Sequence, residues 1–260
     1  MRSRLDLWLV DHGLAESREK AQALVMAGRV RVDGRPVTKA GAAVKSAAAV
    51  AVQPGPEHVG RGALKLAGAL DSFGIDPSGR VAVDVGASTG GFTETLLARG
   101  ARRVYAVDVG RGQLHERVRS DPRVVSLERV NARDLSIREV PEPCDIATVD
   151  VSFISTLKIL PALKAVLSAE ADLLILVKPQ FEVGREQVGK GGVVKDPTLH
   201  LQAVREVARG AGALGFAILA ACPSPITGSE GNREFFLHLR PSGPGLSPHA
   251  LAAALAEAVS

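Results

Sequence analysis

The sequence predicts an α/β protein in which a large domain, built on a seven-stranded and mainly parallel sheet, follows a small α+β domain. Three observations support this prediction. Beyond residue 80, short apolar runs alternate with helical stretches, as expected for a parallel sheet buried on both faces. Residues 53–60 contain two prolines and two glycines, which can continue neither a helix nor a strand. The length of 260 residues suits one small and one large domain, so we expect domains at 1–52 and 61–260 and a linker at 53–60.

The composition excludes several classes of protein. At 46% hydrophobic and 23% charged residues, the chain is neither disordered nor fibrous. No segment approaches the ~18 apolar residues of a membrane span, and the N-terminus lacks the apolar core of a signal peptide. We therefore expect a soluble, cytoplasmic protein with no membrane contact. Cys144 and Cys222 lie far apart and outside any CxxC motif, and the histidines show no ligand spacing, so we expect neither a disulfide nor a metal site.

The small domain is expected to contain two helices and a hairpin. A short helix over 5–10 ends at Gly13, and a second helix begins after Ser17 and ends at Gly28. The turn pair at 33–34 joins strands at 30–32 and near 37, and 48–52 can return as a third strand. Nine Lys/Arg against six Asp/Glu in residues 1–60 indicate, weakly, a surface for a polyanion.

In the large domain, strands are expected at 81–85, 104–109, 124–130, 146–151, 173–177, 216–220 and 235–239. Helices are expected at 63–73, 92–99, 113–119, 155–168, 198–212 and 247–258. The last two strands have no helix-length segment between them, so they can pair antiparallel. Seven strands that end in this way are typical of a Rossmann-like methyltransferase domain.

The N-terminal segment resembles the S4 RNA-binding domain. The resemblance rests on Arg4-Leu5-Asp6, Gly13-Leu14, Ser17-Arg18, Ala21, Leu24, Gly28, Val30, Val32 and Gly34. S4 domains present basic side chains to structured RNA, which here implies Arg4, Arg18, Lys20, Arg29 and Arg31. The alternative is that these residues are solvated charges on a small cap.

A glycine-rich turn at residues 81–93, VAVDVGASTGGFT, connects a strand to a helix start. It is not the dinucleotide fingerprint, because Ser88 stands where a glycine is needed, and it is not a P-loop, because Phe92 follows Gly91. It resembles the loop that binds S-adenosylmethionine in methyltransferases. The resemblance implies cofactor contacts from Asp84, Gly86, Ala87, Ser88, Thr89, Gly90, Gly91, Phe92 and Thr93, from Asp108 to the ribose, and from Asn131 and Ala132 near the adenine. A tight turn without a ligand is the alternative.

Across its whole length the chain resembles the TlyA-type (haemolysin A) family, in which an S4 domain precedes an FtsJ-like ribose 2′-O-methyltransferase. The family's Lys-Asp-Lys-Glu tetrad is matched in order by Lys65, Asp150, Lys178 and Glu234. The resemblance implies S-adenosylmethionine-dependent methylation of cytidines in 16S and/or 23S ribosomal RNA, with an effect on capreomycin and viomycin sensitivity. Taken singly, each of the four residues has a plainer interpretation as a surface charge or a strand-end cap.

The chemistry explains the tetrad. A ribose hydroxyl is a poor nucleophile, so the enzyme must align it with the methyl group and help its proton to leave. We expect Lys178 to orient the hydroxyl and accept the proton. Asp150 and Glu234 are expected to hold the lysines, and Lys65 can also bind the target phosphate or ribose. The glycine-rich segment 182–195 is expected either to close over RNA or to be a merely solvated loop.

Two other functions remain open from the sequence. One is a pore-forming haemolysin, a label that this family has carried, and the other is a non-catalytic RNA-binding assembly factor. The first lacks a membrane segment, and the second is opposed by the complete tetrad. In the family that the chain resembles, members that act on both ribosomal subunits tend to have longer ends. The three residues before Arg4-Leu5-Asp6 and the helix expected at 247–258 match this, so the resemblance favours activity on both subunits. The sequence leaves the oligomeric state open.

Overall fold

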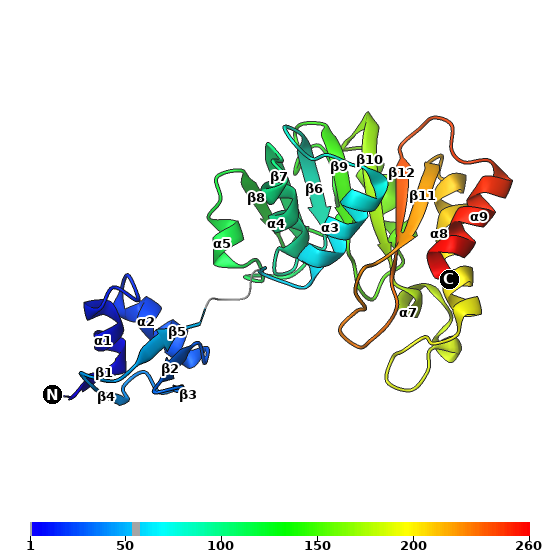
Figure 1. The fold of residues 1–260 in the computed structure, drawn as a ribbon. Helices are drawn as coiled ribbons and strands as arrows, with labels where there is room; N and C mark the ends of the chain where they lie inside the picture. The colour runs from blue at the N-terminus through cyan, green and yellow to red at the C-terminus, as the bar shows by residue number, and fades with distance from the viewer. Residues whose placement is uncertain (1, 54–57) are drawn as a thin grey trace. The chain divides into compact units, whose positions relative to one another are not determined.

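The computed structural model describes residues 2–53 and 58–260 and divides the chain into two compact units, 1–57 and 58–260 (Figure 1). Residues 54–57 of the predicted linker at 53–60 lie outside the described residues. The domain bounds 1–52 and 61–260 therefore stay a prediction. Within the described ranges, no helix is both long and apolar enough to cross a bilayer.

The first unit pairs two helices with short antiparallel strands. Its elements are β1 (Arg2–Arg4), α1 (Leu5–Asp11), α2 (Arg18–Met26), β2 (Val30–Val32), β3 (Arg35–Pro36), β4 (Ala43–Lys45) and β5 (Val50–Val52). The Ser17 side chain accepts a hydrogen bond from the backbone N–H of Lys20 and caps α2. β2 lies between β3 and β5, while β1 pairs with β4. The sequence prediction missed the β1–β4 pair and placed a strand near residue 37, whereas β3 ends at Pro36.

The second unit contains a seven-stranded sheet in the order β11-β12-β10-β9-β6-β7-β8. The strands are β6 (Val81–Val85), β7 (Arg103–Asp108), β8 (Val124–Glu128), β9 (Cys144–Val149), β10 (Leu167–Val177), β11 (Ala217–Pro223) and β12 (Phe235–Arg240). β6 to β10 pair in parallel, and β12 runs antiparallel to both β10 and β11. The predicted fold class and the antiparallel final pair are thus confirmed.

Helices cover both faces of this sheet (Figure 1). They are α3 (Gly62–Phe73), α4 (Gly91–Ala98), α5 (Glu116–Arg119), α6 (Leu160–Lys164), α7 (Pro179–Glu182), α8 (Pro197–Ala213) and α9 (Pro248–Val259), with 3-10 turns η1 (Ala132–Asp134), η2 (Thr156–Lys158) and η3 (Arg185–Gln187). Ala82 of β6 packs in the core that α3 and α4 cover, whereas its neighbour Val83 packs in the core under α6, α8 and α9. This alternation along a fully buried strand explains why the predicted strands are continuously apolar.

The predicted helix at 155–168 is wrong. η2 and α6 occupy only 156–158 and 160–164, and β10 already begins at Leu167. Leu167 pairs with Cys144 at the start of β9, and a register shift separates this pair from that of Asp172 with Ile146. Pairing with β9 therefore overrides the helical propensity of an alanine- and leucine-rich segment. The helix predicted at 113–119 shortens to α5.

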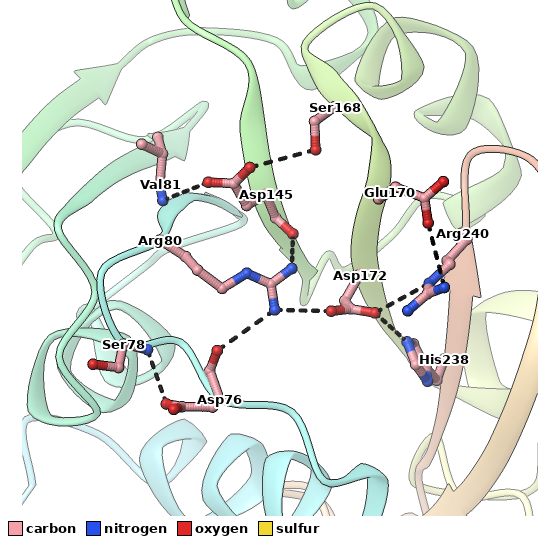
Figure 2. Close-up of polar contacts among 10 residues, drawn as sticks. All are labelled: Asp76, Ser78, Arg80, Val81, Asp145, Ser168, Glu170, Asp172, His238 and Arg240. Atoms are coloured by element: carbon pink, nitrogen blue, oxygen red, sulfur yellow. Dashed lines mark hydrogen bonds and ion pairs between the residues drawn. The ribbon is translucent and has the colours of Figure 1, made fainter.

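A charged network joins strands at the edge of the sheet where β6 and β9 begin (Figure 2). The Asp172 carboxylate, in a side chain only 11% exposed, accepts hydrogen bonds from Arg80 Nη1 at 2.8 Å and His238 Nε2 at 2.9 Å. Arg240 Nε lies 3.5 Å from the same carboxylate. Burial alone would raise the pKa of Asp172, but the hydrogen bonds from His238 and Arg80 outweigh burial and lower the pKa to about 2. The network ties the start of β6 to β10 and β12.

Candidate active site

Three of the four predicted tetrad residues come from strand ends. Asp150 follows β9 and Lys178 follows β10, so both lie at the carboxyl edge of the parallel strands. Glu234 precedes β12, which runs in the opposite direction, and therefore lies at the same edge. Lys65 comes from the first turns of α3. The strand directions thus explain how residues far apart in sequence converge.

The structure brings the tetrad together as two ion pairs. Lys65 Nζ lies 2.6 Å from Glu234 Oε2, with side chains that are 10% and 3% exposed. Lys178 Nζ lies 2.5 Å from Asp150 Oδ1 and donates to Ser152 Oγ at 3.1 Å. Because each lysine is paired with its own carboxylate, the site carries two ammonium groups at little net charge.

A cavity of about 340 Å³, the substrate cavity, is lined by three members of these pairs, whereas Asp150 lines a second cavity beside it. Lys65, Lys178 and Glu234 line the substrate cavity together with aromatic and amide side chains, among them Phe153, Phe181, Gln180 and Asn232. Phe153 is 92% exposed, has a left-handed backbone (φ +65°) and lies 5.1 Å from the Phe181 ring centroid. The sequence patterns assigned no role to Ser152, Phe153 or Asn232, although all three stand two or three residues from a tetrad member.

A second cavity, of about 450 Å³, lies at the ends of β6, β7 and β8. Of the predicted cofactor residues, Gly86, Ser88, Asp108, Asn131 and Ala132 line it. Apolar side chains of Val109, Val130 and Ile154 complete the wall, and Ser152 and Phe153 belong to the lining of both cavities. A nucleoside-sized ligand in one cavity and a substrate in the other would therefore meet at Ser152 and Phe153.

Two features shape this second cavity, which we call the cofactor cavity. Gly86 has φ +84°, and a Cβ there would lie 2.3 Å from the backbone oxygen of Asp150, so only glycine fits the turn. The Asp108 carboxylate accepts hydrogen bonds from the backbone N–H groups of Ser88 at 2.8 Å and Gly110 at 2.7 Å. Each carboxylate oxygen keeps a further lone pair for a ligand hydroxyl. Apolar walls beside an oriented carboxylate fit an adenosyl group.

Asp84 does not line the cofactor cavity. It is fully buried, and its two oxygens accept hydrogen bonds from Thr93 Oγ1 at 2.7 Å and Thr148 Oγ1 at 2.8 Å. Burial raises the pKa of Asp84 to about 6 despite these two bonds. Asp84 therefore supports the loop from beneath.

The other predicted residues of the loop are also outside the lining of this cavity. They are Ala87, Thr89, Gly90, Gly91, Phe92 and Thr93. Phe92, on α4, packs in the core that α3 and α4 cover. Direct contact of these residues with a cofactor stays a prediction.

In the first unit, each predicted RNA-binding residue has a protein partner. Arg4 and Arg18 donate to Asp6, Lys20 pairs with Glu16, Arg29 donates to the backbone oxygen of Gln53, and Arg31 donates to that of Gly34. All five lie at the surface of the unit, and their contact with RNA stays a prediction. Asp6, which the sequence analysis passed over, is fully buried and also accepts from Gln22 at 3.0 Å. The Arg4 hydrogen bond holds the pKa of Asp6 well below its usual range.

Metal ligands do not gather in the described ranges, where no three His, Cys, Asp or Glu side chains are placed to hold one ion. Cys144 and Cys222 are buried free thiols, and burial raises the pKa of Cys144 to about 12.

Comparison with known proteins identifies the family to which the chain belongs. Residues 58–241 match the model of the FtsJ-like methyltransferases, and residues 3–50 match that of the S4 domain. The chain is 51% identical over 241 residues to the 16S/23S rRNA (cytidine-2′-O)-methyltransferase TlyA of Mycobacterium tuberculosis, covering 92% of this chain and 90% of that protein. It is 39% identical to hemolysin A of Brachyspira hyodysenteriae, with 90% and 98% covered. A solved structure named as a hemolysin, from Streptococcus thermophilus, superposes with a TM-score of 0.73 at 38% identity, over 98% of this chain and 94% of that one.

Proposed function

We infer that this chain, which belongs to the FtsJ-like methyltransferase family and carries an S4 domain, is an S-adenosylmethionine-dependent rRNA (cytidine-2′-O)-methyltransferase. The observation that carries the proposal is the pair of ion pairs, Lys65–Glu234 and Lys178–Asp150, beside a cavity that shares Ser152 and Phe153 with the cofactor cavity. The name of the mycobacterial relative supplies the substrate, cytidines of 16S and 23S RNA. The partners are then the ribosomal subunits, and the place of action is the cytoplasm.

The residues of the chain divide the chemical work. Bound S-adenosylmethionine supplies an activated methyl group on a sulfonium. Lys178 Nζ, which is paired with Asp150 in the resting site, orients the ribose 2′-hydroxyl toward that group. Once Lys178 has released a proton to solvent, its neutral amine takes the hydroxyl proton while the oxygen attacks. Asp150, 2.5 Å away, then stabilises the ammonium that forms. Ser152 Oγ fixes the direction of Lys178 by accepting a hydrogen bond from it.

Lys65 and Glu234 form the second half of the site. The Lys65 ammonium faces the substrate cavity and can bind the phosphate or ribose of the target nucleotide. Glu234, only 3% exposed, holds that ammonium in place. Asp108 and the cavity at the ends of β6 to β8 hold the adenosyl part of the cofactor in this proposal.

The two alternatives are less well supported. A pore-forming haemolysin has no use for paired lysines and carboxylates next to a nucleoside-sized cavity. A non-catalytic assembly factor has no need to place two lysines against two carboxylates at 2.6 and 2.5 Å, one of the pairs buried, since burying charged groups is costly.

Methyl transfer to purified ribosomal subunits tests the proposal. We expect the chain, with S-adenosylmethionine, to add 2′-O-methyl groups to cytidines of 30S and 50S subunits that lack them, and Lys178→Ala to add none. The sites would be mapped by mass spectrometry of nuclease digests. Methyl transfer to bases, to proteins alone or to no component of the subunits would overturn the proposal. Methylation of only one subunit would support the activity and limit its substrate to that subunit.

A further inference from the structure

The loop between α7 and α8 (residues 183–196, the α7–α8 loop) is tied down by the side chain of Asn232. Asn232 Oδ1 accepts from the backbone N–H of Val194, and Asn232 Nδ2 donates to the backbone oxygen of Gly192, both at 2.9 Å. Asn232 itself is only 1% exposed. An amide can make this paired contact because it carries a donor and an acceptor side by side. One side chain therefore binds the loop backbone at two points, as a neighbouring strand would.

A second buried side chain completes the anchor. The Nε2–H of His200, on α8, donates to the backbone oxygen of Val194 at 2.8 Å, and His200 is 2% exposed. Both polar backbone groups of Val194 are thus held by side chains from two other segments. At the other end of the loop, Glu182 accepts from the backbone N–H and hydroxyl of Thr156. The loop is fixed at both ends, while its middle, including Lys190, is exposed.

The same short segment carries the anchor and a tetrad residue. Asn232 stands two residues before Glu234, whose carboxylate holds Lys65. The backbone oxygen of Asn232 accepts from Gly228, and that of Glu234 accepts from Ser224, so the segment is itself braced. Gly192, Asn232, Glu234 and Lys65 all line the substrate cavity. A displacement of the loop at residues 192–194 is therefore transmitted to Asn232 and, through the backbone from 232 to 234, to the Lys65–Glu234 pair.

We propose that Asn232 is a positioning residue that couples the α7–α8 loop to the Glu234–Lys65 pair, so that contacts of the loop with RNA set the placement of that pair. This inference rests on the proposed methyl transfer. Asn232 does not touch the reacting atoms in this arrangement. It acts through Glu234: when the α7–α8 loop moves, Asn232 moves Glu234, and Glu234 moves the Lys65 ammonium in the substrate cavity.

Asn232→Asp tests the coupling with almost no change in shape. The carboxylate keeps an acceptor for Val194 N–H but loses the donor to Gly192 and places a charge against that carbonyl. We expect kcat on ribosomal subunits to fall about 10–100-fold, as for a small misplacement of catalytic groups, with S-adenosylmethionine affinity within about twofold of wild type. Trypsin should cleave faster at Lys190. Gln202→Glu, the same amide-to-acid change on α8 and outside the lining of the substrate cavity, is the matched control and should leave kcat unchanged.

A double-mutant cycle separates positioning from a merely structural role. If Asn232 acts through Glu234, then Asn232→Asp should change single-turnover rates less than about twofold in a Glu234→Gln background. Additive losses would overturn the inference, as would a wild-type kcat in Asn232→Asp. Inactive wild-type enzyme would instead contradict the proposed function.

His200→Leu provides a second route should Asn232→Asp fold poorly. It frees the backbone oxygen of Val194 and keeps the hydrogen bonds of the segment 228–234, while leucine preserves apolar packing against Phe235, whose ring centroid lies 5.5 Å from that of His200. The variant should both expose Lys190 to trypsin and lower kcat. Faster cleavage with an unchanged kcat would reject the coupling.

Discussion

Asp172→Asn should destabilise the second unit, because it removes the carboxylate that Arg80, His238 and Arg240 share (Figure 2). The pKa of Asp172 falls from its ordinary 3.8 to about 2. At about 1.4 kcal/mol per unit, the ionised carboxylate contributes about 2 kcal/mol to folding. Removing one partner of a fully buried pair costs about 3–5 kcal/mol, but Arg80 is 25% exposed and can be partly hydrated. We therefore expect a loss of about 2 kcal/mol, or about 4–8 °C in Tm for a unit of this size.

The dependence on pH has a definite sign. A depressed carboxyl pKa stabilises the folded state above pH 4, and this contribution is lost as the pH falls through about 2. The difference between wild type and Asp172→Asn should therefore shrink to about half by pH 3. Cys144 and Cys222 are buried in the second unit, so labelling of thiols with increasing urea reports its unfolding, whereas fluorescence of Trp8, the single tryptophan, reports the first unit.

A matched control lies in the same network. Glu170 is 84% exposed and approaches Arg240 at 3.5 Å, so Glu170→Gln should change the free energy of unfolding by less than about 0.5 kcal/mol. The Trp8 transition should not move in either variant. An Asp172→Asn midpoint equal to that of wild type, or an equal loss at pH 3 and pH 7, would refute the reasoning.

Three further predictions concern the site. Asp108→Ala should weaken S-adenosylmethionine binding by about 10-fold or more in calorimetric titration, through loss of charge-assisted hydrogen bonds of about 1.5–3 kcal/mol each; unchanged affinity would remove Asp108 from the cofactor site. Lys178→Ala and Lys178→Arg should both lower turnover by about 10²–10⁴-fold with little change in cofactor affinity, because alanine has no amine and the guanidinium of arginine stays protonated. Wild-type turnover in the arginine variant would eliminate the proton-acceptor role. For Asp84, the raised pKa of about 6 means that ionisation opposes folding. The free energy of unfolding of wild type, relative to that of Asp84→Asn, should therefore fall by about 2 kcal/mol between pH 4 and pH 6 in urea titrations; an unchanged difference would contradict the raised pKa.

The sequence predicts the sheet well and the partners of individual polar side chains poorly. Continuous apolar strands such as β6 have one interpretation, buried parallel pairing, and the tetrad falls at strand ends whose direction follows from the topology. The helix predicted at 155–168 failed because leucine- and alanine-rich segments suit helix and strand alike, and pairing with β9 decides between them.

Side-chain partners are decided by contacts that periodicity does not encode. Asp84 is a cofactor-ligand candidate from its position in the loop, yet it is fully buried outside the cavity lining, where it accepts hydrogen bonds from Thr93 and Thr148. The paired contacts of Asn232 join residues about 40 positions apart, so no local pattern announces them.

Asp6 has a consequence for any polyanion that the first unit binds. Its carboxylate accepts from Arg4 and Arg18, whose side chains remain 49% and 50% exposed, and the remaining guanidinium N–H groups stay available. A long side chain that becomes immobile only on binding costs about 0.5–1.5 kcal/mol in conformational entropy. Here that ordering takes place when the unit folds, so both arginines would already be oriented when such a polyanion binds. A buried negative charge thereby strengthens a positively charged surface.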